Sequence, residues 1–230
     1  MSKLSTIIAS FLVAVGIAAS GFFIKVGLDH FHKPTGSVNV KGLVEVPVKS
    51  DYVVWQINYS DEGNDLQQAV EKAKLSKEAI NRFLVKYGLA AYSRPTLPNV
   101  ERREDPDKTT KIVVKSGFVI SCADVDKVDA AYSESSSLLN DNVNLVDPWG
   151  TRPRYIYKKF NERRPELFSI AVKNAQEMAE KFAKDSNVKL GKIMSADQGT
   201  FEILALNQGE ADFSKDKIIR VVSRFTYSIL

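Results

Sequence analysis

The chain has 230 residues, of which 44% are hydrophobic and 26% are charged, as is usual for a folded domain. Its formal net charge is +4, but residues 1–33 contribute +2 of this, so the remaining body is close to neutral. A nearly neutral body excludes a strongly basic nucleic-acid-binding domain. The single cysteine, Cys122, excludes an internal disulfide.

An uncharged run near the N-terminus, residues 4–24, has the length of a membrane-spanning helix. At a rise of about 1.5 Å per residue it covers about 30 Å, the thickness of the hydrocarbon core of a bilayer. The small residues 18–20 resemble the cleavage site of a secretory signal, but the apolar run continues to residue 24, as a retained anchor requires. We predict an inner-membrane anchor and short linker in residues 1–33, followed by a periplasmic domain in residues 34–230. Cleavage and release into the periplasm is the alternative.

The body opens with two runs of alternating apolar residues. The first row consists of Val38, Val40, Val44, Val46 and Val48. Gly42 in the same row indicates a bulge or a close packing neighbour. The second row consists of Val53, Trp55, Ile57 and Tyr59. Because only Ser50 and Asp51 separate the ends of the two runs, we predict a β-hairpin.

A helix is predicted next. Asn64 is its expected N-cap, with Gln67 as the capping-box partner. Helical spacing then relates Leu66, Ala69, Val70, Ala73, Ile80, Leu84 and Tyr87. Gly88 follows the last of these residues and favours the end of the helix.

Two strands of different quality follow this helix. Residues 92–104 predict an irregular edge strand, because Pro95 and Pro98 interrupt them. Residues 111–122 predict a regular strand that ends at Cys122. The alternation of Cys122 with apolar residues indicates a buried thiol rather than a reactive one.

A second helix is predicted to begin at Asp124 or Asp126. Its apolar spine is Val125, Val128, Tyr132 and Leu139. Residues 143–145 then predict a short strand, and residues 153–160 predict another one after a turn at residues 147–150.

The segment from residue 164 to residue 199 contains the most regular helix of the chain. Its apolar residues span an arc of about 140° at a helical spacing of about 100° per residue: Phe168, Ala171, Val172, Ala175, Met178, Ala179, Phe182 and Ala183. Four alanines in this arc allow close approach to a sheet. Asn187, which tolerates a left-handed backbone, is predicted to end the helix, and residues 188–195 to continue as a strand.

The C-terminus alternates strictly in Ile219, Val221, Phe225, Tyr227 and Ile229, which predicts a last strand within the sheet. The element order is β-β-α-β-β-α-β-α-β-β after the N-terminal transmembrane or signal helix. We therefore predict an α+β fold with a largely antiparallel sheet and helices packed on one face.

Three segments resemble the SIMPL-domain family. They are SVNVKGLVEVPVKSDYVVWQINYSDEG from residue 37, FVISCADVDKVDAAY from residue 118, and the alanine-rich helix followed by NVKLGKI. Family members usually have glycine where Asn187 stands. The resemblance implies an exported bacterial protein of unknown activity. It also implies assembly into rings and a role in an envelope or oxidative stress response.

The densest positive charge lies between residues 151 and 164, where Glu162 is the only acid. The cations are Arg152, Arg154, Lys158, Lys159, Arg163 and Arg164. Aromatic residues among them are typical of a nucleic-acid surface, but an exported domain favours anionic lipid head groups or an acidic polymer. The other interpretation is a solvated strand followed by the basic approach to a helix.

Catalytic signals are weak throughout the sequence. His30 and His32 form the only histidine pair, without other metal-ligand types nearby, so we predict neither metal nor cofactor. A carboxylate-dependent hydrolase is the alternative function. Its obvious pairs, Asp124 with Asp126 and Asp105 with Asp107, lie where helix caps and turns already explain them.

We therefore predict a non-enzymatic envelope protein that acts by self-assembly or by binding a partner. The proline-interrupted edge strand and the apolar residues of the C-terminal strand are surfaces that a second copy of the chain is able to cover. The expected state is a homo-oligomer held in the membrane through residues 4–24, without nucleic acid.

Overall fold

A computed structural model describes residues 3–31, 36–104, 106, 109–146, 151–207 and 209–230. Helix α1 (Lys3–Phe31) covers the apolar run at residues 4–24. Within the part of the chain that the structure describes, no helix has the length and apolar character that a bilayer span needs. The roles of anchor and of cleaved signal both stay predictions.

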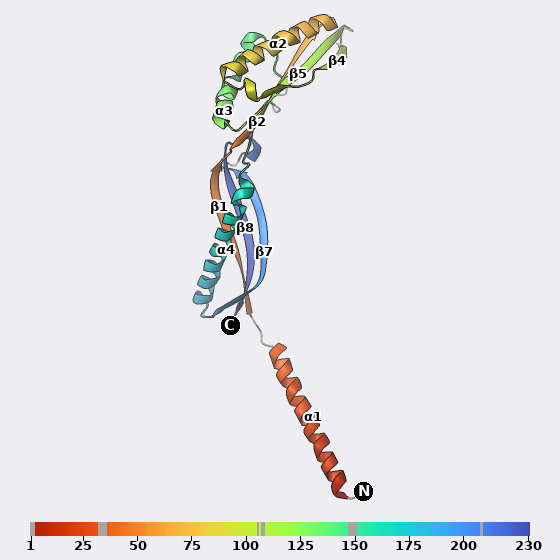
Figure 1. Ribbon diagram of the computed structural model, residues 1–230, viewed down its shortest axis with the longest axis vertical. Coiled ribbons are helices and arrows are strands. Elements are labelled where there is room, and N and C mark those ends of the chain that lie inside the picture. Colours follow the sequence, from red (N-terminus) through yellow and green to blue (C-terminus); the bar gives the residue numbers. More distant parts are fainter. Residues whose placement is uncertain (1–2, 32–35, 105, 107–108, 147–150, 208) are drawn as a thin grey trace. The chain divides into compact units, whose positions relative to one another are not determined.

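The chain divides into two compact units. One contains Met1–Val40, Gln176–Ala196 and Phe225–Leu230, and the other contains Lys41–Ala175 and Asp197–Arg224. The fold is α+β, as predicted, with two sheets instead of one (Figure 1).

The larger sheet has five strands: β2 (Tyr52–Gly63), β3 (Ser93–Pro95), β4 (Asn99–Glu104), β5 (Thr110–Cys122) and β6 (Arg154–Ile156). Their order is β3-β5-β2-β6, and β4 also pairs with β5. All of these pairings are antiparallel. The predicted irregular edge strand is present as β3 and β4, which lie along the same side of β5 and are separated by residues 96–98.

The predicted hairpin between the first two strands is wrong. Strand β1 (Gly36–Lys49) belongs to the smaller sheet, whereas β2 pairs with β5 and β6. The Ser50 N–H donates to the Lys215 carbonyl (2.9 Å), and the Asp51 N–H donates to the Ile156 carbonyl (3.1 Å). Two-residue hairpin turns are favoured by pairs such as Asn-Gly, Asp-Gly or Gly-Gly, and Ser50-Asp51 contains no glycine.

Helices α2 (Leu66–Lys86) and α3 (Val125–Ser133) cover one face of the five-stranded sheet (Figure 1). Trp55 of β2 makes edge-to-face contacts with Phe83 of α2 and Tyr132 of α3, with ring centroids 6.4 and 5.9 Å apart. One ring in contact with both helices places these two helices on the same face. The third predicted helix packs on the other sheet, so the prediction that all helices share one face is met only in part. The core around Trp55 includes Val53, Ile57, Tyr59, Ile80, Leu84, Ile120, Val128 and Leu138.

Both helices begin at carboxylate caps. The Asp65 carboxylate accepts the Gln68 N–H, and the Gln68 side-chain oxygen accepts the Asn64 N–H, both at 2.8 Å. The predicted capping box is therefore shifted by one residue, because the negative Asp65 is the more favourable group at a helix N-terminus. Asp124, one of the two predicted starts of α3, accepts the Lys127 N–H at 3.2 Å.

The stretch between residues 134 and 160 departs most from the predicted elements. Helix α3 ends at Ser133, and the 3-10 helix η2 (Ser135–Asp141) buries Leu138 instead of the predicted Leu139. The change of helical period explains the shift from one leucine to the other. The predicted strand at residues 143–145 is a single bridge between Leu145 and Tyr59. The strand predicted for residues 153–160 is limited to the three residues of β6.

The smaller sheet consists of β1, β8 (Asp216–Ile229) and β7 (Leu190–Ala205), with β8 in the middle. The predicted C-terminal strand is confirmed, and its side chains at Phe225 and Tyr227 are buried. Strand β7 extends well beyond the predicted end at residue 195. It passes through Gly199 at φ 71°, where a Cβ would lie 1.6 Å from the Val222 carbonyl oxygen, so no other residue fits there.

Helix α4 (Phe160–Asp185) lies along this smaller sheet (Figure 1). Its buried row consists of Leu167, Ala171, Ala175, Ala179 and Ala183. A Cβ at Gly42 of β1 would lie 2.0 Å from the Ala171 carbonyl oxygen, so the two backbones touch there. The close approach predicted from the alanines and from Gly42 is confirmed.

The predicted apolar arc of α4 is too wide. Met178 and Phe182 are 56% and 47% exposed, although the arc places both in the core. Contact through a single row of alanines covers only a narrow stripe of the helix, and larger residues at its border stay in solvent. The end of the helix is as predicted: Asn187 has φ 53°, and the Val188 N–H donates to the Ala183 carbonyl at 2.9 Å.

Candidate functional site

The six predicted cations lie on three different local structures. Arg152 is in the turn before β6, and Arg154 is in β6. Lys158 and Lys159 are in the turn after β6, and Arg163 and Arg164 are in the first turns of α4. Side chains project with different periodicities from a strand, a turn and a helix. Cations that are close together in the sequence therefore do not necessarily form one surface.

Several of these cations already have partners in the protein. Arg154 forms an ion pair with Asp212 at 2.7 Å, and both side chains are largely exposed. Arg163 pairs with Glu166 at 3.4 Å, which raises the pKa of the guanidinium. The Arg152 guanidinium lies 4.1 Å from the ring centroid of Phe213, in the 3-10 helix η3 (Ala211–Phe213).

The turn before α4 binds a carboxylate through its backbone. The N–H groups of Lys158 and Lys159 donate to the two carboxylate oxygens of Asp51, at 2.7 and 3.2 Å. Arg164 lies over the rings of Phe160 and Phe201, 5.8 and 4.8 Å from their centroids. Positive side chains here flank a helix N-terminus, where Asp51 supplies the negative charge that the backbone favours.

The face of the five-stranded sheet opposite α2 and α3 is here called the open face. It carries residues of the basic segment together with residues from other parts of the chain. Antiparallel register places Arg154, Val54 and Ser121 in one row across β6, β2 and β5. The next row places Gln56, Val119 and Arg94 across β2, β5 and β3. Directly paired residues share a face, so Arg154 and Arg94 lie on the open face at opposite edges of the sheet.

A hollow of about 510 Å³ lies on this open face, here called the tyrosine–arginine hollow. It is lined by Tyr52, Ala91, Tyr92, Arg94, Val119 and Ser121. The ammonium of Lys158 lies over the ring of Tyr52, 3.0 Å from its centroid. Tyr92 ends the 3-10 helix η1 (Ala90–Tyr92), which leads directly into β3 and so sets the ring beside Arg94 in the chain.

Sequence reasoning found Lys158 and Arg154 but missed Tyr52, Tyr92 and Arg94. Tyr52 alternates with the buried Val53, so its position on the side away from the core is readable from the sequence. Tyr92 and Arg94 lie in the irregular edge segment, where the sequence carries no clear period.

A comparison with protein-family models matches this chain to a family of unknown function. The family model SIMPL, described as a protein of unknown function (DUF541), matches residues 38–215. The chain belongs to the SIMPL family. The match covers all but the first two residues of β1 and the whole five-stranded sheet, which confirms the resemblance seen in the sequence. A comparison with curated proteins found no match.

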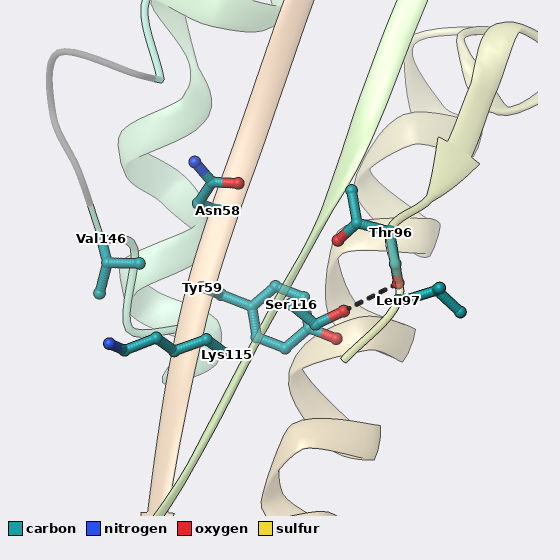
Figure 2. Close-up of a pocket in the computed structure, with 7 residues that line it drawn as sticks. All are labelled: Asn58, Tyr59, Thr96, Leu97, Lys115, Ser116 and Val146. Atoms are coloured by element: carbon teal, nitrogen blue, oxygen red, sulfur yellow. Dashed lines mark hydrogen bonds between the residues drawn. The ribbon is translucent and has the colours of Figure 1, made fainter. Parts of the chain in front are cut away.

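The SIMPL domain has a second hollow, of about 400 Å³, at the other end of β2 and β5 (Figure 2). It is lined by Asn58, Tyr59, Thr96, Leu97, Lys115, Ser116 and Val146. The Ser116 hydroxyl donates to the Thr96 carbonyl at 3.2 Å, the bond dashed in Figure 2. Burial raises the pKa of Tyr59, so its hydroxyl stays protonated and is available for hydrogen bonding only.

A third hollow of the SIMPL domain, of about 440 Å³, contains an unusual carboxyl group. Burial raises the pKa of Asp61, against the opposing effects of Ser76 and Lys72. Glu62, the next residue, faces the other side of β2 and pairs with Arg103 at 2.6 Å. Asp61, Glu62 and Asp141 are all among the residues that line this hollow, although strand alternation directs the Asp61 and Glu62 side chains to opposite faces of the sheet.

One of the two carboxylate pairs proposed for hydrolysis in this SIMPL domain has structural partners. Asp124 caps α3 and pairs with Lys127 at 2.7 Å, and Asp126 pairs with Lys215 at 3.2 Å. Asp105 and Asp107 lie outside the described residues, as do the side chains of the histidine pair.

The single thiol of the SIMPL domain is buried, as predicted. Burial raises the pKa of Cys122, and its Sγ–H donates to the Asp124 carbonyl at 3.6 Å. Burial is the largest of these effects, and it favours the protonated thiol over the thiolate that nucleophilic chemistry needs.

Proposed function

We propose that this chain is a non-enzymatic protein of the bacterial envelope that acts by self-assembly. In this proposal residues 4–24 hold it in the inner membrane as a single pass, and residues 34–230 lie on the periplasmic side. Cleavage at residues 18–20 is the alternative location. N-terminal sequencing of the mature protein distinguishes the two, since a chain that begins near residue 21 has been cleaved.

The observation that carries the assembly proposal is an open strand beside exposed apolar residues. Strand β7 is an outer strand of the three-stranded sheet, so along the described residues its second side is free to pair. Ile193 and Met194 of β7 are 51% and 59% exposed, and Met178 and Phe182 of α4 are also exposed. A long edge with exposed apolar side chains is what another strand or a second copy covers.

The surface that carries this proposal differs from the one expected at first. Strand β8 was predicted to offer Phe225, Tyr227 and Ile229 to a neighbour, but it lies between β1 and β7 and buries the first two. The exposed residues of α4 and β7 take its place in the proposal.

The test is the oligomeric state of the full-length protein in mild detergent. Sedimentation should give an oligomer for the native chain, and the double variant Phe182→Ser, Ile193→Lys should shift it towards the monomer. Val85→Ser removes an equally exposed apolar residue from α2 and serves as the matched control. A native chain that sediments as a monomer at tens of micromolar, or a double variant that assembles as well as the control, contradicts the proposal.

The process proposed for the assembly is the envelope or oxidative stress response that the family resemblance implies. A strain that lacks the protein should be more sensitive to peroxide. The native gene and the Val85→Ser variant should restore resistance, and the double variant should not. If the native gene, the Val85→Ser variant and the double variant all restore resistance equally, the physiological role does not depend on assembly.

A further inference from the structure

The tyrosine–arginine hollow has the composition of a small ligand site. Its volume of about 510 Å³ lies in the range of small-molecule pockets, which are about 300–1,000 Å³. Two tyrosines and Val119 supply apolar walls, and Ser121 supplies a hydroxyl. These residues come from β2, η1 and β5, elements fixed by the core on the other face of the sheet, so the hollow is formed before any ligand binds.

The hollow is bordered by positive charge that the nearby acids do not neutralise. Arg94 is exposed on the outer strand β3, and no carboxylate pairs with it among the described residues. The Lys158 ammonium lies over Tyr52. Asp51 directly precedes Tyr52 in the chain, and its two carboxylate oxygens already accept the N–H groups of Lys158 and Lys159.

Two other cations near the hollow, Lys127 and Arg154, are paired with carboxylates. Lys127 raises the local positive potential near Tyr92, and Asp124 holds its ammonium at 2.7 Å. Arg154, on the same open face, is held by Asp212. An anion that enters the hollow therefore meets Arg94 without displacing an existing carboxylate, and the Lys158 ammonium adds positive charge at Tyr52.

We propose that the tyrosine–arginine hollow binds an acidic saccharide, a sugar that carries a carboxylate. A pyranose ring has a flat C–H face that packs on a tyrosine ring, and hydroxyl groups that suit Ser121 and the tyrosine hydroxyls. Its carboxylate suits the planar guanidinium of Arg94, which binds carboxylates through two parallel hydrogen bonds. This binding is separate from assembly, because none of its residues lies on β7 or on α4.

Other anions match the hollow less well. A lipid acyl chain needs a long apolar channel, whereas the apolar lining here is limited to two rings and two small or branched side chains. Inorganic phosphate would use the cations but not the tyrosines. A nucleotide base would stack on a tyrosine, but readout of its edge needs amide groups that do not line the hollow.

The experiment is calorimetric titration of the full-length protein with trigalacturonate at low salt. The neutral trisaccharide of galactose, inorganic phosphate and uridine monophosphate are the comparison probes. The variants are Arg94→Gln and Tyr92→Ala, both at exposed positions that leave the core intact. Arg102→Gln is the matched control, an exposed arginine of β4 whose pairing with Ile112 places it on the opposite face of the sheet.

The proposal expects saturable binding of trigalacturonate, with the neutral trisaccharide at least about tenfold weaker. Loss of the bidentate contact in Arg94→Gln should weaken binding about tenfold to a hundredfold. Tyr92→Ala should weaken it by a similar factor, and Arg102→Gln should bind like the native chain. Phosphate that binds as tightly as trigalacturonate, tighter binding of uridine monophosphate, or equal affinity of all variants overturns the proposal. A monomeric protein that still binds would leave this proposal standing and remove the assembly proposal.

Discussion

The two sheets of this protein are covered by helices in two different ways. On the five-stranded sheet, the interface with α2 and α3 combines small residues with large aromatic ones, and Trp55 contacts both Phe83 and Tyr132. On the three-stranded sheet, α4 contacts the strands through alanines, and at Gly42 a single Cβ would collide with the helix backbone. Large aromatic side chains contribute to the first interface, whereas alanine and glycine allow the backbones to touch in the second.

The difference decides what each interface tolerates. A core of large side chains loses stability when atoms are removed, because a cavity remains. An interface of alanine and glycine has little to lose by removal, but an added atom has no space and must move a backbone. The close contact also leaves the larger border residues of α4 in solvent, and these are the residues that we propose a second copy covers.

The largest expected effect is a charge placed in the alanine row. Ala175→Asp buries a carboxylate against the sheet without a partner and should lower the free energy of unfolding by about 4 kcal/mol. Glu180→Lys produces a larger change in charge than Ala175→Asp does, but on the exposed side of the same helix. It should alter the free energy of unfolding by less than about 0.5 kcal/mol. Urea unfolding of both variants measures the difference. Similar midpoints would mean that the row is not a packed interface.

The second prediction compares a methyl group added to the smaller-sheet interface with a methylene group removed from the larger-sheet interface. Gly42→Ala adds one methyl group beside the Ala171 carbonyl and should destabilise the protein by about 2–3 kcal/mol. Ile80→Val removes one methylene from the completely buried α2 face and should cost about 1 kcal/mol. The order of the two unfolding midpoints is the measurement. If Ile80→Val is the more damaging change, the smaller sheet accommodates bulk and the contrast fails.

The sequence predicts most elements of both interfaces but not the way in which they are joined. Periods of 2 and 3.6 residues are local, so residues 111–122, 219–229 and the alanine row were found from spacing alone. The partner of β1 was not, because strand pairing depends on residues more than 160 positions away. The exposure of Phe182 was missed because the sequence of a helix shows only which residues form its apolar arc. The sheet against which the helix packs determines how much of that arc is buried.

The candidate site was predictable only in part for a related reason. The basic segment is visible as a local density of charge, but the tyrosine–arginine hollow joins residues 52, 92–94 and 119–121 through the register of three strands. Nothing local in these segments marks them as neighbours. Alternation identifies Tyr52 and Val119 only as residues on the side away from the core.

The third prediction compares two buried tyrosines, one in each sheet. The Tyr155 hydroxyl donates to Asp129 at 2.8 Å, and Asp129 also accepts from Lys215 at 2.9 Å. The Tyr227 hydroxyl of β8 is buried and has no hydrogen-bond partner among the described residues. Tyr155→Phe should therefore cost about 1–2 kcal/mol, and Tyr227→Phe should be neutral or slightly stabilising. Thermal unfolding of the pair decides it, and equal losses would contradict the assignment of Asp129 as the partner that matters.

The smallest expected effect concerns Asp61, beside the core of the five-stranded sheet. Burial raises the pKa of its carboxyl above 3.8, the ordinary value, so between 3.8 and that raised value the folded protein binds a proton more readily than the unfolded chain. The contribution of Asp61 to stability is therefore fully present below pH 3.8 and is lost as the pH rises through the folded pKa. Because the group is partly solvated, the change should not exceed about 0.5 kcal/mol.

Two variants test this assignment from opposite directions. Asp61→Asn removes the titrating group, so the pH dependence of its urea midpoint should flatten between pH 3.8 and the raised folded pKa, relative to the native chain. Ser76→Ala removes the hydroxyl that holds the pKa of Asp61 down, so the same window should extend to higher pH. Lys72, which also lowers this pKa, is unchanged in both variants and gives the same background. A native profile that Asp61→Asn leaves unaltered would show that this carboxyl is as well solvated in the folded protein as in the unfolded chain, and the packing that surrounds it would then be looser than the core next to it.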